Sequence, residues 1–355
     1  MTEEKLAIQE NLPLSTLTTI KLGGNARYFI SCESEEEIIS ALKYAKENNL
    51  EVFVMSGGSN VIFPDEGFKG LVIQVNNKGI EFDDELVVCK AGENWDNFVA
   101  QCVDKGLGYI ECLSGIPGSV GATPIQNVGA YGQEVKDSIV LVKAIDRESL
   151  EEMEFLNADC NFSYRNSRFK SEDKDKYIIT EVTFRLKNNC IPHIRYAELN
   201  RYLNQFIDME TLLPGREKLT IVRNAVLEIR KKKGMVIDPK DPYSVSCGSF
   251  FTNPILVDED YWEFKKIAKR SGRKFPKFED PKGKKLSAAW LIENSGLEKG
   301  YQRKGVGISE KHILALVNYG GGTTDSLLHL AEFIKEKVKR KYKVELEIEP
   351  IVVTN

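Results

Sequence analysis

Two glycine-rich segments of this sequence could hold an anionic ligand. The first, Ser56–Asn60, reads Ser-Gly-Gly-Ser-Asn and directly follows a short apolar stretch. The second, Ser114–Gly132, contains five glycines, two prolines and no charged side chain, unlike a solvated surface loop. Glycine lets the backbone approach a ligand closely, and consecutive N–H groups can cradle a phosphate. The two segments predict a pyrophosphate site; the alternatives are a plain turn for the first and a buried connection without a ligand for the second.

Neither segment matches the standard nucleotide-binding patterns. A Rossmann dehydrogenase would carry GxGxxG after its first strand, and a P-loop kinase would carry a Walker motif. Both classes are therefore poorly supported, and two glycine loops that flank one pyrophosphate remain as the hypothesis.

Hydrophobic periodicity predicts the elements that must position these loops. Two strand-and-helix units come first, short strands dominate up to about residue 188, and a polar, irregular stretch precedes a mainly helical C-terminal part. The pattern predicts an α+β fold with a first domain over 1–188, an inter-domain stretch over 189–215 and a C-terminal α/β substrate domain over 216–355. The predicted strands are 27–30, 52–55, 71–75, 86–90, 139–146, 152–156, 177–186, 313–318 and 344–353, and the predicted helices are 36–47, 95–105, 219–232, 258–270, 287–294 and 324–340.

Composition excludes several classes of protein. The chain has 355 residues, 42% hydrophobic and 29% charged, with a net charge of −4. No run approaches the roughly 20 apolar residues of a membrane span, and the acidic N-terminus does not resemble a signal peptide. The charge gives no reason to expect a nucleic-acid partner. Seven cysteines without a CxxC pair favour reduced thiols, so we expect a cytoplasmic protein that neither inserts into a membrane nor binds a metal.

Several motifs, in order along the chain, resemble the UDP-N-acetylenolpyruvoylglucosamine reductase family. Besides the two glycine loops, they are Tyr164–Phe169, Gly248–Pro254, Ala288–Ile292 and Leu346–Glu349. The resemblance runs from about Asn11 to the C-terminus. It implies a two-subdomain, PCMH-type FAD-binding domain of the vanillyl-alcohol-oxidase-like flavoproteins, followed by a substrate domain that binds a UDP-sugar. The residues that match the family's cofactor site are Gly57, Gly58, Ser59, Asn60, Gly115, Pro117, Gly118, Val120, Gly121, Ala122, Gln126, Asn127, Gly129, Ala130, Tyr131 and Gly132.

The resemblance also implies the reaction, in which non-covalent FAD, reduced by NADPH, reduces an enolpyruvyl ether. Arg165 matches the family's catalytic arginine, whose fixed charge suits a carboxylate or an enolate. Ser249 matches the serine that donates a proton to the α-carbon, and Glu349 matches the catalytic glutamate. Glu345 and Glu347 alternate with Glu349 and share its face in an extended strand, so the register of this assignment is open.

The family's substrate contacts match Tyr164, Tyr196, Arg230, Lys233, Asn253 and Asn294. Tyr196 lies in the polar stretch between the domains, which resembles the substrate-capping loop of the longer, type I branch. Lys233 ends a basic run that a diphosphate would pair with. Asn294 stands where some relatives carry Gln, Ile351 where many carry Arg, and Gly234–Asp238 departs from the Leu-Pro-Asp-Pro form of others. A monomer is expected from the family.

Two other functions compete with this interpretation. One is an oxidase of the same fold that binds FAD non-covalently and acts on a sugar or an alcohol. Many oxidases of this fold attach FAD covalently through a side chain, and the absence of any histidine before His193 argues against attachment through histidine. The other is a UDP-sugar-binding protein without catalysis, which would not need Ser249 as a proton donor. No histidine lies near the motifs along the sequence, so a Ser-His-Asp triad is also disfavoured.

Overall fold

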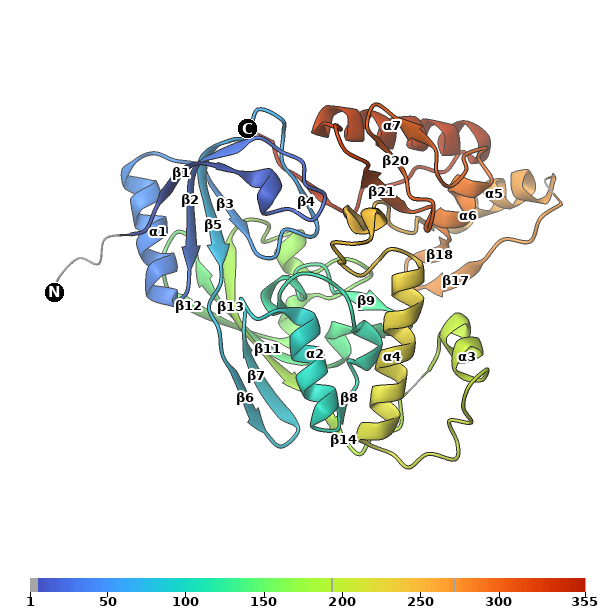
Figure 1. The fold of residues 1–355 in the computed structure, drawn as a ribbon, viewed down its shortest axis with the longest axis horizontal. Helices are drawn as coiled ribbons and strands as arrows, with labels where there is room; N and C mark the ends of the chain where they lie inside the picture. Colours follow the sequence, from blue (N-terminus) through green and yellow to red (C-terminus); the bar gives the residue numbers. More distant parts are fainter. Residues whose placement is uncertain (1–5, 193, 271, 355) are drawn as a thin grey trace. The chain divides into compact units, whose positions relative to one another are not determined.

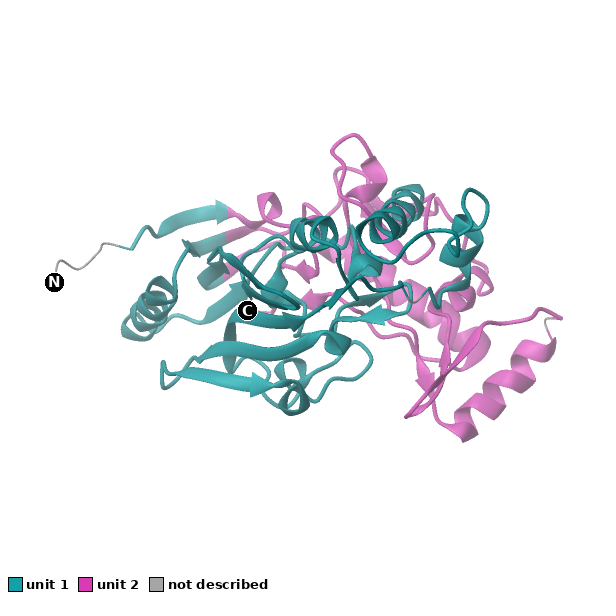
Figure 2. Ribbon diagram, turned by 90° about the horizontal axis from the view of Figure 1, so that it is seen from below, with its two compact units in different colours: residues 1–12, 26–58, 69–232 teal, residues 13–25, 59–68, 233–355 magenta. Residues whose placement is uncertain are grey.

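The computed structural model describes residues 6–354 except 193 and 271. The chain divides into two compact units, coloured separately in Figure 2. Unit 1 comprises Met1–Leu12, Ala26–Gly58 and Lys69–Lys232, and unit 2 comprises Pro13–Asn25, Ser59–Phe68 and Lys233–Asn355. Each unit has its own hydrophobic core. All seven cysteines are free thiols.

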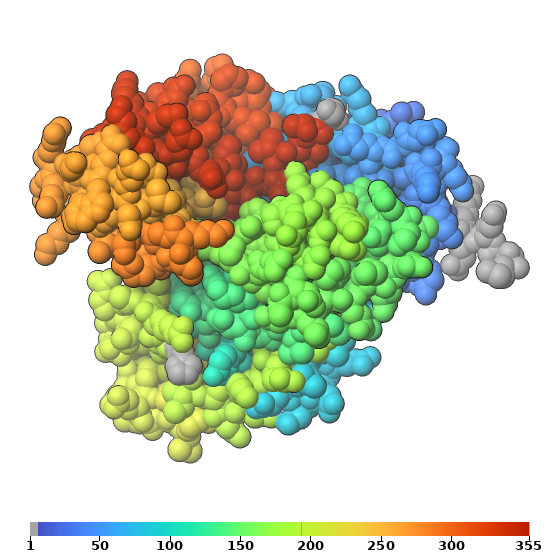
Figure 3. All heavy atoms as spheres, turned by 180° about the vertical axis from the view of Figure 1, so that it is seen from behind, coloured from blue at the N-terminus to red at the C-terminus, as the bar shows by residue number. Residues whose placement is uncertain are grey.

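Unit 1 is built on two main sheets (Figure 1). The first has the order β1-β2-β5-β3, with β3 parallel to β5, and the second is an antiparallel sheet of order β12-β11-β13-β7-β6. In the space-filling view of Figure 3, the green segments around β11 to β13 form a continuous surface. The strands are β1 (Gln9–Pro13), β2 (Asn25–Cys32), β3 (Val52–Met55), β5 (Phe68–Val75), β6 (Ile80–Asp83), β7 (Leu86–Lys90), β8 (Leu107–Gly108), β9 (Gly129–Ala130), β10 (Gln133–Glu134), β11 (Ile139–Asp146), β12 (Glu152–Leu156), β13 (Tyr177–Arg185) and β14 (Lys187–Asn188).

Four α-helices and several short 3₁₀ turns complete unit 1. The helices are α1 (Glu35–Glu47), α2 (Trp95–Asp104), α3 (Ala197–Leu203) and α4 (Arg216–Lys232). The 3₁₀ turns are η2 (Glu111–Leu113), η3 (Val120–Ala122), η4 (Val135–Asp137), η5 (Asn157–Cys160) and η6 (Arg168–Lys170).

Local sequence explains why α1 begins where it does. The Ser34 side chain accepts a hydrogen bond from the N–H of Glu37 at 3.2 Å and so satisfies one of the free donors of the first turn. Acidic residues occupy that turn, where the helix dipole favours negative charge. Ile38, Leu42 and Ala45 recur at helical spacing and are buried, so one face of α1 packs into the core.

Helix α4 belongs to unit 1, although the sequence-based boundary places it in the C-terminal domain. Its buried face includes Val222, Val226 and Ile229, which pack with Leu199 and Leu203 of α3 in one hydrophobic cluster. The helix also lies beside α2, as Figure 1 shows. Its amphipathic pattern was read correctly from the sequence, but the pattern does not say which core the apolar face joins.

Unit 2 combines two small antiparallel sheets with three helices. Its four-stranded sheet has the order β15-β21-β20-β19, and its three-stranded sheet has the order β16-β18-β17. Strands β4 and β22 pair in parallel, which joins the segment at residue 61 to the C-terminal end. The elements are η1 (Leu14–Thr16), β4 (Val61–Ile62), η7 (Pro242–Ser244), β15 (Ser246–Ser249), β16 (Ile255–Leu256), α5 (Asp258–Arg270), β17 (Lys277–Asp280), β18 (Gly283–Leu286), α6 (Ala288–Glu293), β19 (Gln302–Arg303), β20 (Val306–Ile308), β21 (Ala315–Asn318), α7 (Thr324–Tyr342) and β22 (Ile351–Val352).

Two sequence-based expectations about strands were wrong. The second of the two strand-and-helix units expected from the sequence combined strands 71–75 and 86–90, but these strands lie in different sheets. The predicted closing strand 344–353 is a strand only at Ile351–Val352, with an isolated bridge between Phe251 and Ile348. The period-two burial of 344–347 is present, because Val344 and Leu346 are buried in the core, but this part does not pair in a ladder.

A short N-terminal segment caps the longest helix of unit 2. The two carboxylate oxygens of Asp65 accept hydrogen bonds from the N–H groups of Thr324 and Asp325, at 2.8 and 2.9 Å. These groups belong to the first turn of α7 and have no acceptor within the helix. Asp65 is therefore one of the contacts that join residues 59–68 to the rest of unit 2.

We expect Asp65→Ala to lower the free energy of unfolding by about 1 kcal/mol, because it removes two acceptors and a favourable negative charge from the first turn of α7, while Thr323 remains as the N-cap. Urea denaturation followed by circular dichroism measures the change. The neighbouring exposed Glu66, changed to alanine, is the control and should leave the stability within about 0.5 kcal/mol. Equal effects of the two substitutions would contradict the assigned role of Asp65.

Candidate active site

The two glycine loops contact each other through their backbones. A Cβ atom placed on Gly57 would stand only 2.9 Å from the Cα of Gly118, so only glycine fits there without a shift of the backbone. The hydroxyl groups of Ser56 and Ser119 hydrogen-bond to each other across the same contact. The sequence placed the loops on either side of one ligand, and the structure brings residues 56–57 and 118–119 together.

The second loop is held by the segment that leads into α2. The carbonyl of Gly118 accepts from the N–H of Trp95 at 3.1 Å. The N–H groups of Val120 and Gly121 donate to the carbonyls of Glu93 and Ala91, each at 2.9 Å. These amides thus bind protein acceptors. The expectation that the loop offers its amides to an anion does not apply to Val120 and Gly121, whose contribution is to fix the loop.

Close backbone approach is also what a backbone-lined site for a cofactor such as FAD requires. A Cβ on Gly57 would stand 2.9 Å from the Cα of Gly118, so at this contact the two loops meet with no side chain between them. The backbone at Gly115 and Gly118 has positive φ values of 72° and 112°, which side chains disfavour. Pro117, Ala122 and Gln126 continue the same loop, and all three are partly exposed.

Asn127 is a structural anchor of the second loop. It is fully buried with a φ of 45°, and its amide donates to a carboxylate oxygen of Glu134 at 3.1 Å and to the carbonyl of Ser163 at 2.9 Å. Its side-chain oxygen accepts from the N–H of Lys136 at 3.2 Å. These contacts account for a polar residue at this position and tie the loop to the residues just before Arg165.

Arg165 meets the cofactor loop directly. Its guanidinium donates a hydrogen bond to the carbonyl of Gly129 at 2.7 Å and lies 5.3 Å from the ring centroid of Tyr164. The backbone of Arg165 has a φ of 51°, a left-handed conformation that is uncommon for a residue with a side chain. Ser167 supports the turn, because its hydroxyl donates to the carbonyl of Ile125 at 2.6 Å. The structure thus brings the predicted catalytic arginine next to the predicted FAD residues 129–132.

Tyr131 and Tyr196 also meet in unit 1. Their rings contact edge to face, with centroids 5.4 Å apart and an interplanar angle of 87°. Burial raises the pKa of Tyr131 to about 12, although the nearby charge of Arg230 acts in the opposite direction. Burial likewise lowers the pKa of Arg230, a shift that Tyr131 and Asp96 oppose. Gly132 adjoins the same segment, since its Cβ would lie 3.1 Å from the side chain of Arg195.

Ser249 and Glu349 are held by the same backbone in unit 2. The N–H of Phe250 donates to the carbonyl of Leu314 at 2.7 Å, and its carbonyl accepts from the N–H of Glu349 at 3.0 Å. Phe250 is fully buried, so the residue that follows Ser249 is fixed in the core. Asn60 also holds this segment, because its carbonyl accepts a hydrogen bond from the N–H of Ile351, two residues after Glu349, at 2.9 Å.

One histidine lies near Ser249 in space although it is distant in sequence. Ser249 pairs with Ala315 of β21, and the turn before that strand contains His312. The Nδ1 atom of His312 accepts from the N–H of Leu314 at 3.2 Å. The sequence-based statement that no histidine lies near the motifs therefore holds only along the chain.

Asn253 and Asn294 stand at the two ends of α6. The side-chain oxygen of Asn253 accepts from the N–H of Ala288 at 2.9 Å. The side chain of Asn294, which is buried, accepts from Arg273 at 2.6 Å and donates to the carbonyl of Trp290 at 2.8 Å. Both asparagines therefore stabilise the scaffold. Lys233, which follows α4, is the first residue of the C-terminal segment of unit 2.

Sequence reasoning missed an ion pair that supports the cofactor loop. Asp96 on α2 accepts two hydrogen bonds from Arg223 on α4, at 2.5 and 2.9 Å, and one from the N–H of Gly115 at 2.6 Å. The two side chains are separated by 127 residues. No local pattern marks such a pair, because neither Asp nor Arg is unusual on an amphipathic helix.

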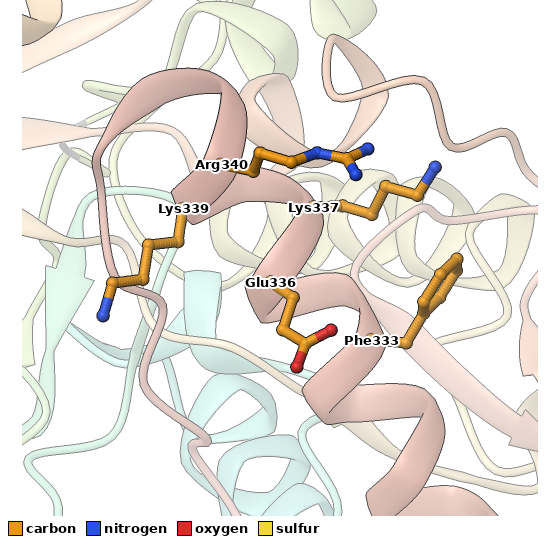
Figure 4. A pocket seen from close by; sticks show the side chains of 5 residues that line it. All are labelled: Phe333, Glu336, Lys337, Lys339 and Arg340. Atoms are coloured by element: carbon orange, nitrogen blue, oxygen red, sulfur yellow. The ribbon is translucent and has the colours of Figure 1, made fainter.

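A surface hollow in unit 2 is lined only by α7 (Figure 4). Its residues come from the basic C-terminal half of that helix, and none is among the predicted site residues. Among the described residues, no group of three or more His, Cys, Asp or Glu side chains could hold a metal ion. No helix formed by the described residues is long and apolar enough to span a membrane. The residues lining the hollow are Phe333, Glu336, Lys337, Lys339 and Arg340.

The comparisons with known proteins place the chain in a class and then in a family. Residues 26–149 match the model of the FAD binding domain family, so the chain is a flavoprotein of that class. Residues 239–353 match the C-terminal domain of UDP-N-acetylenolpyruvoylglucosamine reductase. The chain belongs to the UDP-N-acetylenolpyruvoylglucosamine reductase family, which confirms the resemblance noted in its motifs.

Relatives of this family cover nearly the whole chain. The reductase of Thermobifida fusca is 44% identical over 97% of both chains, and that of Streptomyces coelicolor is 44% identical over 96% of this chain and 89% of its own. The solved reductase of Thermus caldophilus is 22% identical, with a TM-score of 0.67 over 99% of both chains. At that identity the structural match supports the predicted α+β fold.

We expect Gly57→Ala to weaken FAD binding by about tenfold to a hundredfold, because the new Cβ would displace the backbone of Gly118, an overpacking that costs roughly 1–3 kcal/mol. Fluorescence titration of the apoprotein with FAD measures the affinity. Glu47→Ala, at an exposed position of α1, is the control and should bind FAD like the wild type. If Gly57→Ala bound FAD as tightly as the control, the contact between the loops would not shape the cofactor site.

Proposed function

We propose that this protein uses NADPH and FAD to reduce the enolpyruvyl group of UDP-N-acetylglucosamine enolpyruvate, which gives UDP-N-acetylmuramate for the peptidoglycan precursor. The observation that carries this proposal is the contact of Arg165 with Gly129 of the glycine loop, since it sets a permanent cation beside the predicted cofactor residues. The near-full-length identity of 44% to a reductase of that name supports the substrate. The same proposal assigns the protein to the cytoplasm, as a monomer, in the pathway that serves cell-wall growth, cell shape and division.

The cofactor and the residues divide the chemistry between them. FAD, when bound non-covalently, supplies the hydride chemistry and is reduced by NADPH. Gly57, Gly118 and the residues around them would hold it by close backbone packing. We assign Gly58, Ser59, Pro117, Ala122, Gln126 and Ala130 to the same cofactor contact.

Arg165 has the chemistry to stabilise the reacting end of the substrate. Addition of a hydride to the β-carbon leaves negative charge that spreads over an enolate and its carboxylate. A guanidinium is charged at every working pH and presents a planar fork of donors that matches a carboxylate. Arg165 would hold this group and lower the energy of the developing charge.

Ser249 completes the reaction by donating a proton to the α-carbon. A hydroxyl is a weak acid, so the donation depends on the basicity of the enolate and on a neighbour or water that returns the proton. Glu349, whose backbone is joined to Phe250, would orient the substrate or the relay. Arg230 and Lys233 would pair with the diphosphate, with Tyr164, Tyr196, Asn253 and Asn294 around the sugar nucleotide.

The absorption spectrum of the purified protein tests the proposal as a whole. We expect a flavin band that NADPH bleaches under anaerobic conditions and that the UDP-enolpyruvyl sugar then restores. Reoxidation by oxygen alone would favour the oxidase of the same fold. No flavin after addition of FAD would refute the proposal.

Ser249→Ala tests the proton donor by separating the two half-reactions. We expect reduction of the flavin by NADPH at an unchanged rate and reoxidation by the sugar roughly 10²–10⁴-fold slower, because only the second step needs the proton. Stopped-flow absorbance measures both rates in one sample. Ser249→Cys, which keeps a proton donor, should restore part of the second rate; an Ala variant with both rates unchanged would exclude Ser249 as the donor.

A further inference from the structure

We propose that Asp96 and Arg223 form a positioning pair that fixes the cofactor loop at Gly115, with Arg223 neutralising a carboxylate that would otherwise repel the anionic cofactor. The proposal rests on the proposed function, because it concerns the binding of FAD. It assigns a role to two residues that neither the motifs nor the family resemblance singled out.

The geometry of the pair is that of a strong, directed contact. The two terminal nitrogens of Arg223 reach the two carboxylate oxygens of Asp96 at 2.5 and 2.9 Å. Such two-pronged pairs are the strongest and most specific of the charge-assisted hydrogen bonds. The side chain of Arg223 is only 14% exposed and that of Asp96 31%, so water screens the pair much less than a surface ion pair.

The first residues of α2 hold the cofactor loop at several points. Asp96 accepts from the N–H of Gly115 at 2.6 Å. Trp95 donates its backbone N–H to the carbonyl of Gly118 at 3.1 Å and its ring N–H to the carbonyl of Leu113 at 3.0 Å. Asn94 forms a bridge with Ser119. Through these contacts, any shift of the start of α2 moves the residues between 113 and 119, which contain the close contact with Gly57.

The negative charge of Asp96 would weaken the binding of an anionic ligand unless another group neutralised it. Burial acts to raise the pKa of Asp96, but the hydrogen bonds from Arg223 and Gly115 and the charge of Arg230 together lower it, so the carboxylate is ionised at neutral pH. A carboxylate at this loop would repel the diphosphate of FAD. Arg223 cancels that charge, and Arg230, seven residues further along the same helix, adds to the effect.

The chain contains a matched control for this pair. Arg216 and Asp104 join the same two helices through an ion pair of 3.2 Å. Their side chains are 68% and 67% exposed, and neither residue hydrogen-bonds to the cofactor loop. A comparison of the two pairs therefore separates the support of the loop from the attachment of α4 to α2.

The test compares Arg223→Gln, Asp96→Asn and the double variant with Arg216→Gln and Asp104→Asn. The affinity for FAD is measured by fluorescence titration of each apoprotein, and the apoprotein's melting temperature is measured beside it. We expect Arg223→Gln to weaken FAD binding by roughly tenfold or more, because it leaves the Asp96 carboxylate uncompensated. Asp96→Asn should weaken it less, and its addition to Arg223→Gln should restore part of the lost affinity. The control variants should bind FAD within about twofold of the wild type.

Several outcomes would overturn the inference. It fails if Arg223→Gln binds FAD like the controls while its melting temperature falls, because the pair would then only hold the helices together. It also fails if the double variant binds more weakly than either single variant, because charge would then not be the cause. If Arg223→Gln does not fold, Arg223→Lys replaces it in the test. Lysine keeps the positive charge but cannot make the two-pronged contact with Asp96. An affinity for FAD equal to that of the wild type would then exclude the role of the pair in positioning the cofactor loop. Wild-type protein that does not bind FAD would overturn the proposed function itself.

Discussion

The close backbone contact between Gly57 and Gly118 is the constraint on which the rest of the cofactor region depends. A Cβ at position 57 would collide with the Cα of Gly118, so the two loops can meet only as glycines. Each loop is tied to a different element: Gln74 of β5 donates to the carbonyl of Ser56 at 3.2 Å, and Trp95 of α2 donates to the carbonyl of Gly118. The contact therefore couples the first sheet to α2. At this contact, backbone packing sets the arrangement of the two loops, and the charges near them come from side chains of other elements.

Helix α4 supplies much of that charge. Arg223 and Arg230 are two turns apart on the same face, and Lys233 follows the last turn. The structure joins Arg223 to the loop at Gly115 through Asp96, whereas the proposed roles of Arg230 and Lys233 concern the sugar nucleotide. A single rigid helix thereby sets the spacing between the support of the cofactor loop and the proposed diphosphate contacts.

Much of the fold could be predicted, because many elements carry local signals. Strands β7, β11 and β12 and helix α5 have the predicted bounds, since their patterns are short and end at turn residues. Contacts between distant residues could not be predicted in this way. The packing of α4 and the pair of Asp96 with Arg223 both depend on tertiary contacts. The glycine loops were found because their composition is unusual, and the roles of Arg165, Ser249 and Glu349 came from the family's motifs alone.

The contacts that hold the backbone at Ser249 and Glu349 bear on the geometry of the proposed proton transfer. Phe250 is buried, its N–H donates to the carbonyl of Leu314, just before β21, and its carbonyl accepts from the N–H of Glu349. The backbone of Glu349 is therefore fixed by a hydrogen bond to the neighbour of Ser249. Asn60, the last residue of the first glycine loop, accepts a hydrogen bond from the N–H of Ile351 and so contacts the C-terminal segment. A proton donor that is weak by nature gains most from such fixed geometry, because its efficiency then depends on distance and orientation more than on its acidity.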